Sequence, residues 1–131
     1  MLALVTALYG SLAALLIVIT ALGVVKVRRR EGIGLDNGGN KSLTHAMRIH
    51  ANLVEYAPIS VLLLLFLELN QAETVWLHTF GIVFLFARVI HLWGFSSNHG
   101  YSHGRFLGTL ITLLNIIAMS LANVFLLLRT V

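Results

Sequence analysis

Four polar side chains recur at intervals of three, four and three residues within one apolar part of the chain. They are His45, Arg48, Asn52 and Glu55. At these intervals, side chains share one face of an α-helix. The uncharged run that follows, residues 56–67, would form about 18 Å of helix, whereas crossing a membrane requires about 30 Å. A helix that spans the membrane here must therefore carry the polar residues into it.

Ionisable residues recur at similar spacing farther along the chain. Arg88 and His91 are three residues apart and follow the uncharged run 74–87, which is also too short to span. We therefore expect Arg88 to lie within the membrane. An ionisable side chain at the centre of a span costs at least about 2.5 to 3.5 kcal/mol, and such residues are functional candidates by default.

Arginines outnumber acidic residues in this predicted membrane region. Arg48, Arg88 and Arg105, which begins the last apolar run, stand against Glu55. One interpretation is a structural ion pair between Glu55 and Arg88, and such a pair can also orient a ligand. The remaining positive charge favours an anionic partner, either a lipid headgroup or a small polycarboxylate or thiolate ligand.

Several other kinds of chemistry lack the residues they need. The chain has no cysteine, so a reactive thiol would have to come from a ligand. No metal site is expected at His91, His99 and His103, because no carboxylate or cysteine accompanies them. A Ser-His-Asp grouping is missing, and the basic residues do not form the single stripe that nucleic-acid binding requires.

Membrane helices are the elements that must position these residues. Of the 131 residues, 58% are hydrophobic and 11% are charged, against roughly 25% charged in an average soluble protein. The uncharged runs and the polar stripes together predict a single all-α domain, a transmembrane four-helix bundle. The predicted helices are residues 1–26, 43–68, 74–95 and 105–129.

The basic residues predict the orientation of this bundle. The first loop carries the basic run from Lys26 to Arg30 and also Lys41, whereas the short second loop holds Glu68 and Glu73 and no basic residue. Loops rich in lysine and arginine face the cytoplasm, so the first and third loops are expected there and both termini outside. A continuous pore is not expected, because the outer half of the second helix is apolar.

The segment Arg48-Ile-His-Ala-Asn52-Leu-Val-Glu55-Tyr56-Ala-Pro58 resembles the signature of the MAPEG family, the membrane-associated proteins in eicosanoid and glutathione metabolism. Its pattern, R-x3-N-x2-E-Y-x-P, is specific. The segment 88–95 is similar to the family's R-x2-Y-x2-G-Y, with His91 and Phe95 at the tyrosine positions, and Arg105 lies close to the arginine that opens the family's fourth helix. The likeness covers nearly the whole chain and extends to the small bacterial inner-membrane branch.

The resemblance implies a homotrimer in the inner membrane, with glutathione held between neighbouring subunits near the cytoplasmic face. Carried over position by position, the glutathione-binding residues would be Arg48, His50, Asn52, Glu55, Tyr56, Arg88 and His91. Arg105 would be the catalytic residue that stabilises the glutathione thiolate.

The implied activity is that of a glutathione transferase or peroxidase of hydrophobic substrates. A thiol has a pKa of about 8.5, and lowering it by about two units requires about 2.7 kcal/mol of preferential thiolate stabilisation. The thiolate would attack a lipophilic electrophile or reduce a lipid hydroperoxide that arrives from the bilayer. The alternative is a non-catalytic anion-binding, glutathione-binding or assembly protein that retains the fold, because His91 and Phe95 lack the tyrosine hydroxyls.

Overall fold

The computed structural model describes residues 2–97 and 102–130, apart from the side chains of residues 95–97 and 130. Within these ranges the chain forms long α-helices and no strand. They are α1 (Leu4–Glu31), α2 (Lys41–Leu69), α3 (Thr74–Ser97) and α4 (His103–Thr130). Each is long and apolar enough to cross a membrane, which confirms the predicted all-α transmembrane bundle. His99, in the predicted third loop, and the Phe95 side chain lie outside the described residues.

The first helix extends well beyond its predicted end. α1 continues to Glu31, so the basic run from Lys26 to Arg30 is helical rather than part of a loop. Lysine and arginine are good helix formers, and positive charge is stabilising at a helix C-terminus. The helix ends at Gly32, whose φ of 67° is a left-handed conformation that glycine adopts without a steric penalty.

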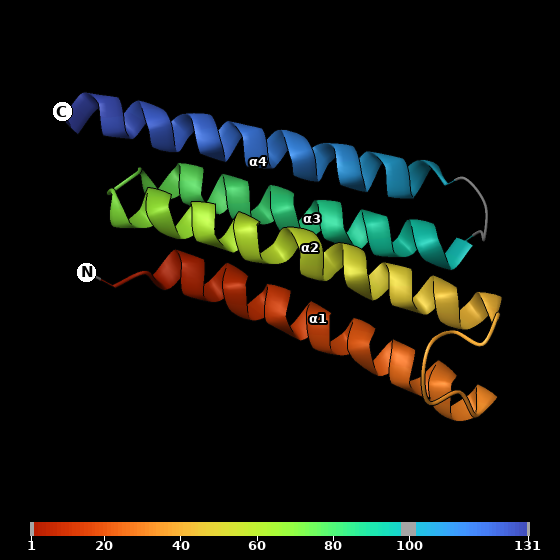
Figure 1. Ribbon diagram of the computed structural model, residues 1–131. Helices are drawn as coiled ribbons and strands as arrows, with labels where there is room; N and C mark the ends of the chain where they lie inside the picture. Colours follow the sequence, from red (N-terminus) through yellow and green to blue (C-terminus); the bar gives the residue numbers. More distant parts are fainter. Residues whose placement is uncertain (1, 98–101, 131) are drawn as a thin grey trace.

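Figure 1 shows the four helices running alongside one another, and α2 contacts each of the other three. α1 packs against α2 and α3, and α4 packs against α3 and α2, whereas the backbones of α1 and α4 do not come close within the described part of the chain. The connection between α1 and α2, residues 32–40, lies at one end of the bundle, here named the loop end. The short connection 70–73, the start of α1 and the end of α4 lie at the other, here named the terminal end.

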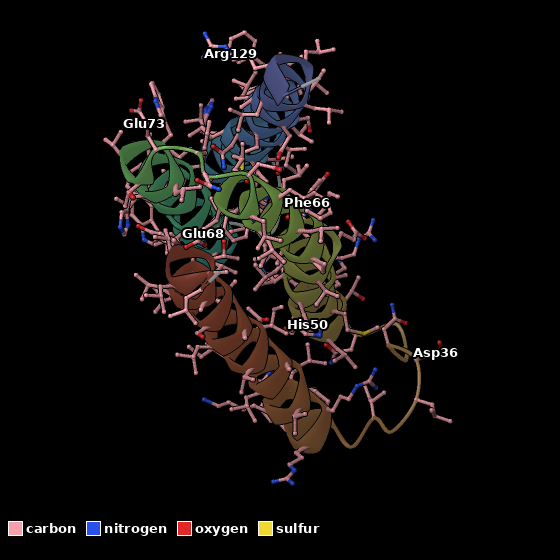
Figure 2. All side chains as sticks on the ribbon, turned by 90° about the vertical axis from the view of Figure 1, so that its left-hand side faces the viewer. Asp36, His50, Phe66, Glu68, Glu73 and Arg129 are labelled. Carbon is pink, nitrogen blue, oxygen red and sulfur yellow. The ribbon has the colours of Figure 1, made fainter. Side chains whose placement is uncertain are left out.

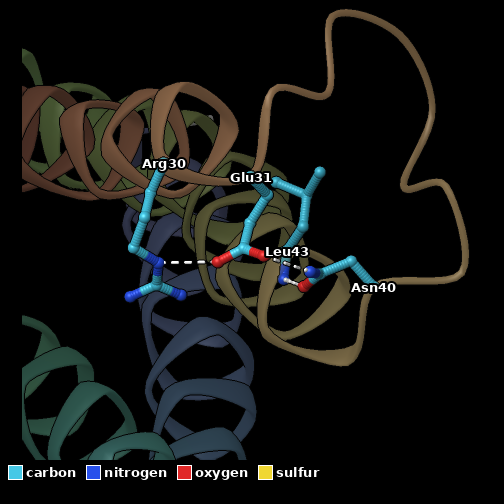
Figure 3. A network of polar contacts seen from close by, with 4 residues as sticks. All are labelled: Arg30, Glu31, Asn40 and Leu43. Carbon is cyan, nitrogen blue, oxygen red and sulfur yellow. Dashed lines mark hydrogen bonds and ion pairs between the residues drawn. The ribbon is translucent and has the colours of Figure 1, made fainter.

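Polar contacts at the loop end hold the start of α2 against the end of α1 (Figure 3). Glu31 pairs with Arg30 at 2.6 Å and accepts a hydrogen bond from Asn40 Nδ2 at 3.0 Å. Asn40 Oδ1 in turn accepts from the backbone N–H of Leu43 at 2.9 Å, which caps α2. This network fixes where α2 begins and therefore helps to set where its polar residues lie.

At the terminal end, α1 is tied to both of its neighbours. Glu68 of α2 accepts hydrogen bonds from the backbone N–H groups of Val5 and Thr6, at 2.9 and 2.7 Å (Figure 2). The carboxylate thereby satisfies free N–H groups at a helix N-terminus, where the helix dipole favours negative charge. The hydroxyl of Tyr9 lies 3.0 Å from Nδ1 of His78 on α3, within hydrogen-bond distance. Glu68, which the sequence places at the boundary between the second helix and its loop, is therefore part of the bundle.

Apolar side chains fill the interior in two clusters. The buried members towards the terminal end are Tyr9, Leu64, Leu67, Leu77 and Met119. Those nearer the middle of the bundle are Ala13, Leu53, Ala57 and Phe84. Large apolar side chains of every helix are also exposed, as expected for surfaces that lipid rather than water surrounds.

Glycines bring the helix backbones together. A Cβ added at Gly81 would overlap the ring of Tyr9, so glycine lets this buried tyrosine of α1 pack on α3. Between α3 and α4, a Cβ at Gly94 would lie 2.6 Å from a backbone nitrogen of α4, and one at Gly108 would lie 2.6 Å from the carbonyl oxygen of Ala87. Small residues are what allow such close approach between membrane helices.

Candidate functional site

A buried arginine joins three helices towards the loop end. Arg88 of α3 is 1% exposed. Its Nη1 donates to Asn52 Oδ1 of α2 at 2.8 Å, and its Nη2 donates to Thr112 Oγ1 and to the Gly108 carbonyl of α4 at 2.6 and 3.0 Å. These four residues are here named the arginine cluster. Hydrogen bonds from a charged donor are stronger than neutral ones, so the cluster holds α2 in a defined rotation against α3 and α4.

The pattern of small residues on α4 builds one half of this cluster. Thr112 Oγ1 donates to the Gly108 carbonyl at 2.8 Å. A Cβ at Gly108 would come within 2.7 Å of His91 Cβ, so α4 lies close enough to α3 for Arg88 to reach a backbone carbonyl. The predicted site did not include Gly108 and Thr112. Their spacing of four residues, the signature of a helix-packing face, is the signal that could have found them.

The interpretation of Glu55 as the structural partner of Arg88 is wrong. Among the described residues, Arg88 donates hydrogen bonds to neutral oxygens, and its Nε has no hydrogen-bond partner there. Asn52 and Glu55 point about 60° apart around the axis of α2, and helix packing turns Asn52 inward. The guanidinium carbon of Arg88 also lies 5.4 Å from the ring centroid of Tyr56, a cation–π geometry. Dipoles and an aromatic ring, rather than a carboxylate, stabilise this charge.

Arg48 and Glu55 point away from the interior of the bundle. Both are exposed, and their separation of seven residues places them within about 20° of one direction and about 10 Å apart along α2. Within the described ranges, neither side chain has a hydrogen-bond or ion-pair partner. The exposed apolar residues Ile59 and Leu62 continue the same side of the helix. This surface, here named the charged face of α2, presents two uncompensated charges in a membrane-spanning segment.

His50 lies on the other side of α2, between α2 and α1 (Figure 2). It follows Arg48 by two residues, which turns it by about 200° around the helix. Its Nδ1 is 3.0 Å from Thr20 Oγ1, and that hydroxyl donates to the carbonyl of Ile17 at 3.0 Å. Because the hydroxyl proton is used there, Thr20 accepts from Nδ1–H, which leaves Nε2 of His50 as an acceptor.

The two remaining predicted site residues lie at the contact between α3 and α4. His91 is 4% exposed, and its Cβ is beside Gly108. Arg105 is half-buried in the first turn of α4, where its backbone nitrogen is beside Gly94. No group of three His, Cys, Asp or Glu side chains that could hold a metal ion occurs among the residues described.

The structure therefore sorts the predicted site residues by surroundings. Asn52, Tyr56 and Arg88 meet inside the bundle, Arg48 and Glu55 share the charged face, and His50, His91 and Arg105 lie at helix contacts. The charged face is the part of this set that lies on the outside of the chain. The arginine cluster lies behind it and supports it through Asn52.

Known membrane proteins resemble this chain over most of its length. Residues 6–125 match the model of the MAPEG family. The chain is 41% identical over 119 residues to "Inner membrane protein YecN" of Escherichia coli strain K12, which covers 91% of this chain and 89% of that protein. The protein of the same name from Escherichia coli O6:H1 gives the same identity and coverage. The family match runs from α1 to α4 and includes both the arginine cluster and the charged face.

Proposed function

This chain belongs to the MAPEG family, and we propose that it is a membrane-bound, glutathione-dependent transferase or peroxidase that acts on hydrophobic electrophiles. The observation that carries the proposal is the charged face of α2. Arg48 and Glu55 are exposed there, in a membrane-spanning helix, without a partner among the described side chains. A charge left in hydrocarbon costs at least about 2.5 kcal/mol, so a polar ligand that covers the face is favoured.

Glutathione has the charges that complement this face. At neutral pH the tripeptide carries one ammonium group, two carboxylates and a thiol. Arg48 is suited to binding a carboxylate through two parallel N–H···O bonds, and Glu55 to accepting from the ammonium group. The two side chains are about 10 Å apart along α2, which matches an extended tripeptide at about 3.3 Å per residue.

The arginine cluster orients Asn52 for a further hydrogen bond to the ligand. Because Arg88 donates to Oδ1 of Asn52, the Nδ2 amide group of Asn52 remains free to donate. Asn52 is about 40° around α2 from Arg48, next to the charged face. We infer that Asn52 donates to a carboxylate or carbonyl of the tripeptide and that Arg88 is a positioning residue.

We infer that neighbouring copies of this chain complete the site as a homotrimer. His50 and Arg48 lie on opposite sides of α2, so one ligand does not reach both within one chain. A second copy packed against the charged face would bring its own His50 or another polar group to the ligand. The same contact would remove Arg48 and Glu55 from lipid.

Arg105 is the proposed catalytic residue. It lies in the first turn of α4, where the helix dipole adds positive charge that favours a thiolate. In the transfer reaction, the sulfur forms a bond to an electrophilic carbon, the leaving group departs with its bonding electrons, and the thiol proton passes to water. In the peroxidase reaction, two glutathione molecules reduce a lipid hydroperoxide to an alcohol and water and leave as the disulfide.

A non-catalytic protein that retains glutathione or anion binding, or a role in assembly, is the second candidate. The observation in its favour is the burial of His91, which stands where the family resemblance places a tyrosine. Packed between α3 and α4, this side chain offers no hydroxyl to a ligand on the charged face. Such a protein would bind glutathione at Arg48 and Glu55 without turning it over.

Titration of glutathione into the purified, detergent-solubilised protein tests binding through the rise in unfolding temperature. Arg48→Gln and Glu55→Gln should each weaken binding by about tenfold or more, because hydrogen bonds to charged groups contribute about 1.5–3 kcal/mol. Arg29→Gln removes an exposed charge at the end of α1 and should bind like the wild type. If the two α2 variants also bind like the wild type, the charged face is not the glutathione site.

Conjugation of glutathione to an aryl halide separates an enzyme from a binding protein. Arg105→Leu should lower the rate by about tenfold for each 1.4 kcal/mol of thiolate stabilisation that is lost. An undiminished rate would contradict the role of Arg105. A wild-type protein that binds glutathione but shows no turnover with either an aryl halide or a lipid hydroperoxide would support the second candidate.

We infer that the loop end faces the cytoplasm from the inner membrane, with both termini outside. Because the chain has no cysteine, Leu35→Cys introduces a single thiol at a position that is 88% exposed in the first connection. A membrane-impermeant maleimide should label this thiol only after the cytoplasmic side is opened. Labelling from outside intact spheroplasts would show that the loop end faces outward, which is the opposite orientation.

A further inference from the structure

A hollow at the terminal end lies at the opposite end of the bundle from Arg105. Its volume is about 480 Å³, within the range of about 300–1,000 Å³ that is typical of ligand pockets. α4 runs past the connection between α2 and α3, and its last turns form one wall (Figure 1). The start of α3 and the end of α2 form the others. The hollow forms where α4 extends beyond the end of α2 and the start of α3.

Aromatic side chains line the apolar part of the hollow. Trp76 and Phe80 come from α3, and Phe125 comes from α4. The rings of Trp76 and Phe80 are 6.5 Å apart between centroids, in a tilted arrangement. Walls of this kind suit a hydrocarbon chain, and aromatic residues are typical of the level at which lipid headgroups begin.

The rim of the hollow carries one charge of each sign. Glu73 directly precedes α3, and its carbonyl accepts from the backbone N–H of Trp76 at 3.0 Å, so its carboxylate lies at the positive end of that helix. Arg129 lies in the last turn of α4, with its guanidinium carbon 4.4 Å from the ring centroid of Phe125. Figure 2 shows Glu73 and Arg129 at the same end of the molecule on different helices. Over the described ranges, neither side chain forms an ion pair.

We propose that this hollow binds a zwitterionic phospholipid whose headgroup carries a primary ammonium group. Arg129 binds the phosphate, Glu73 accepts hydrogen bonds from the ammonium, and one acyl chain lies against the aromatic wall. An anionic lipid would satisfy Arg129 but would place its net charge beside Glu73. A quaternary ammonium headgroup has no N–H to donate to the carboxylate. The pair of rim charges therefore selects the headgroup, whereas the walls accept many acyl chains.

Fluorescence quenching by brominated lipids tests this proposal directly. The chain has two tryptophans, so Trp93→Phe leaves Trp76 in the hollow as the single reporter. The full-length variant is placed in vesicles of phosphatidylethanolamine, phosphatidylglycerol and phosphatidylcholine in which one lipid at a time is brominated. Brominated phosphatidylethanolamine should associate with Trp76 about two- to fivefold more strongly than brominated phosphatidylglycerol or phosphatidylcholine, the range expected for partly exposed charge pairs.

Matched variants separate the site from general contact with lipid. Trp76→Phe leaves Trp93, which is 71% exposed near the loop end, and this reporter should show no headgroup preference. Glu73→Gln should abolish the preference at Trp76, whereas Glu31→Gln, which removes a carboxylate at the loop end, should preserve it. Ala122→Phe, which fills the hollow, should reduce quenching by all three lipids.

Three outcomes would overturn the proposal. Equal preferences at Trp76 and Trp93 would show that the hollow selects no headgroup. A headgroup preference that persists in Glu73→Gln would show that the Glu73 carboxylate does not recognise the headgroup. Absence of quenching at Trp76 by every lipid would mean that a protein surface, such as a second copy of the chain, covers the hollow. None of these results depends on whether glutathione binds at the charged face.

Discussion

The arginine cluster and the charged face of α2 place the same side chain in opposite surroundings. Arg88 is 1% exposed, and its guanidinium donates to oxygens of α2 and α4. Arg48 is exposed, and its side chain has no partner within the described chain. An arginine whose donors are satisfied internally holds helices together, whereas an arginine directed outward is available to a lipid headgroup, a ligand or another chain. Charge within a span can therefore be structural, and the partners of each charged side chain decide whether it is.

The two glutamates of α2 repeat this contrast. Glu68 binds the first N–H groups of α1, whereas Glu55 has no side-chain partner within the described ranges. The acid that lies nearer to the end of the helix is thus committed to the fold. The acid that lies deeper along the span is the one presented outward. What assigns the two roles is the hydrogen-bond partners, which Glu68 has and Glu55 lacks within the described ranges.

The largest effect on stability is expected at Arg88. Arg88→Leu should lower the free energy of unfolding in detergent by on the order of 3 kcal/mol, because it leaves Oδ1 of Asn52 and Oγ1 of Thr112 without the guanidinium donor. Arg88→Lys should recover part of this loss, since lysine keeps the charge but lacks the planar fork. Thermal unfolding measures both variants. If Arg88→Leu is as stable as the wild type, the arginine cluster does not hold the helices together and does not differ in this respect from the charged face.

A smaller loss is expected where α4 approaches α3. Gly108→Ala would place a Cβ 2.6 Å from the Ala87 carbonyl oxygen, and relieving this overlap should cost about 1–3 kcal/mol of unfolding free energy. Gly23→Ala in α1 is the matched control, because no atom lies within 4 Å of its added Cβ. This control should be neutral or slightly stabilising, since alanine favours a helix over glycine. Equal losses at both positions would argue that helix approach does not support the arginine cluster.

Glu68→Gln should have a more modest effect, confined to the terminal end. Losing the charge and one acceptor oxygen at the start of α1 should cost about 1 kcal/mol. Hydrogen–deuterium exchange should rise at the amides of Val5 and Thr6 and stay unchanged around Arg88. Unchanged exchange in the first turn of α1 would contradict the capping role.

The smallest effect on stability is expected at the charged face. Without glutathione, Arg48→Gln and Glu55→Gln should each change the free energy of unfolding by less than about 0.5 kcal/mol, as for surface substitutions away from packed features. Thermal unfolding of the ligand-free protein measures this. A loss as large as that of Arg88→Leu would instead show that Arg48 and Glu55 stabilise the ligand-free protein as structural residues.

The sequence predicted the elements better than their contacts. The lengths of the uncharged runs located four spans, and the spacing of Arg48, Asn52 and Glu55 placed them correctly on one side of α2. The spacing did not reveal that Arg88 would bond to Asn52 rather than to Glu55. These two residues differ by about 60° in direction, a difference smaller than the uncertainty in the rotation of an unpacked helix.

Other contacts left no sequence signal strong enough to find them. Thr20, which meets His50, stands in an apolar run where a threonine also bonds to its own helix. Glu68, expected at the boundary between the second helix and its loop, reaches backbone groups of α1 from more than sixty positions away. Such pairings depend on which helices become neighbours, and no local pattern encodes that choice.

By itself, the sequence determined that the chain crosses a membrane as helices, that charged residues enter it, and which residues share a side of each helix. Those properties follow from hydrocarbon thickness and from the repeat of the α-helix, which are the same in any packing. Only the tertiary structure decided which charges hold the bundle together and which face outward. The reason is that glycine contacts between α3 and α4, together with the bonds of Arg88, set the rotation of α2.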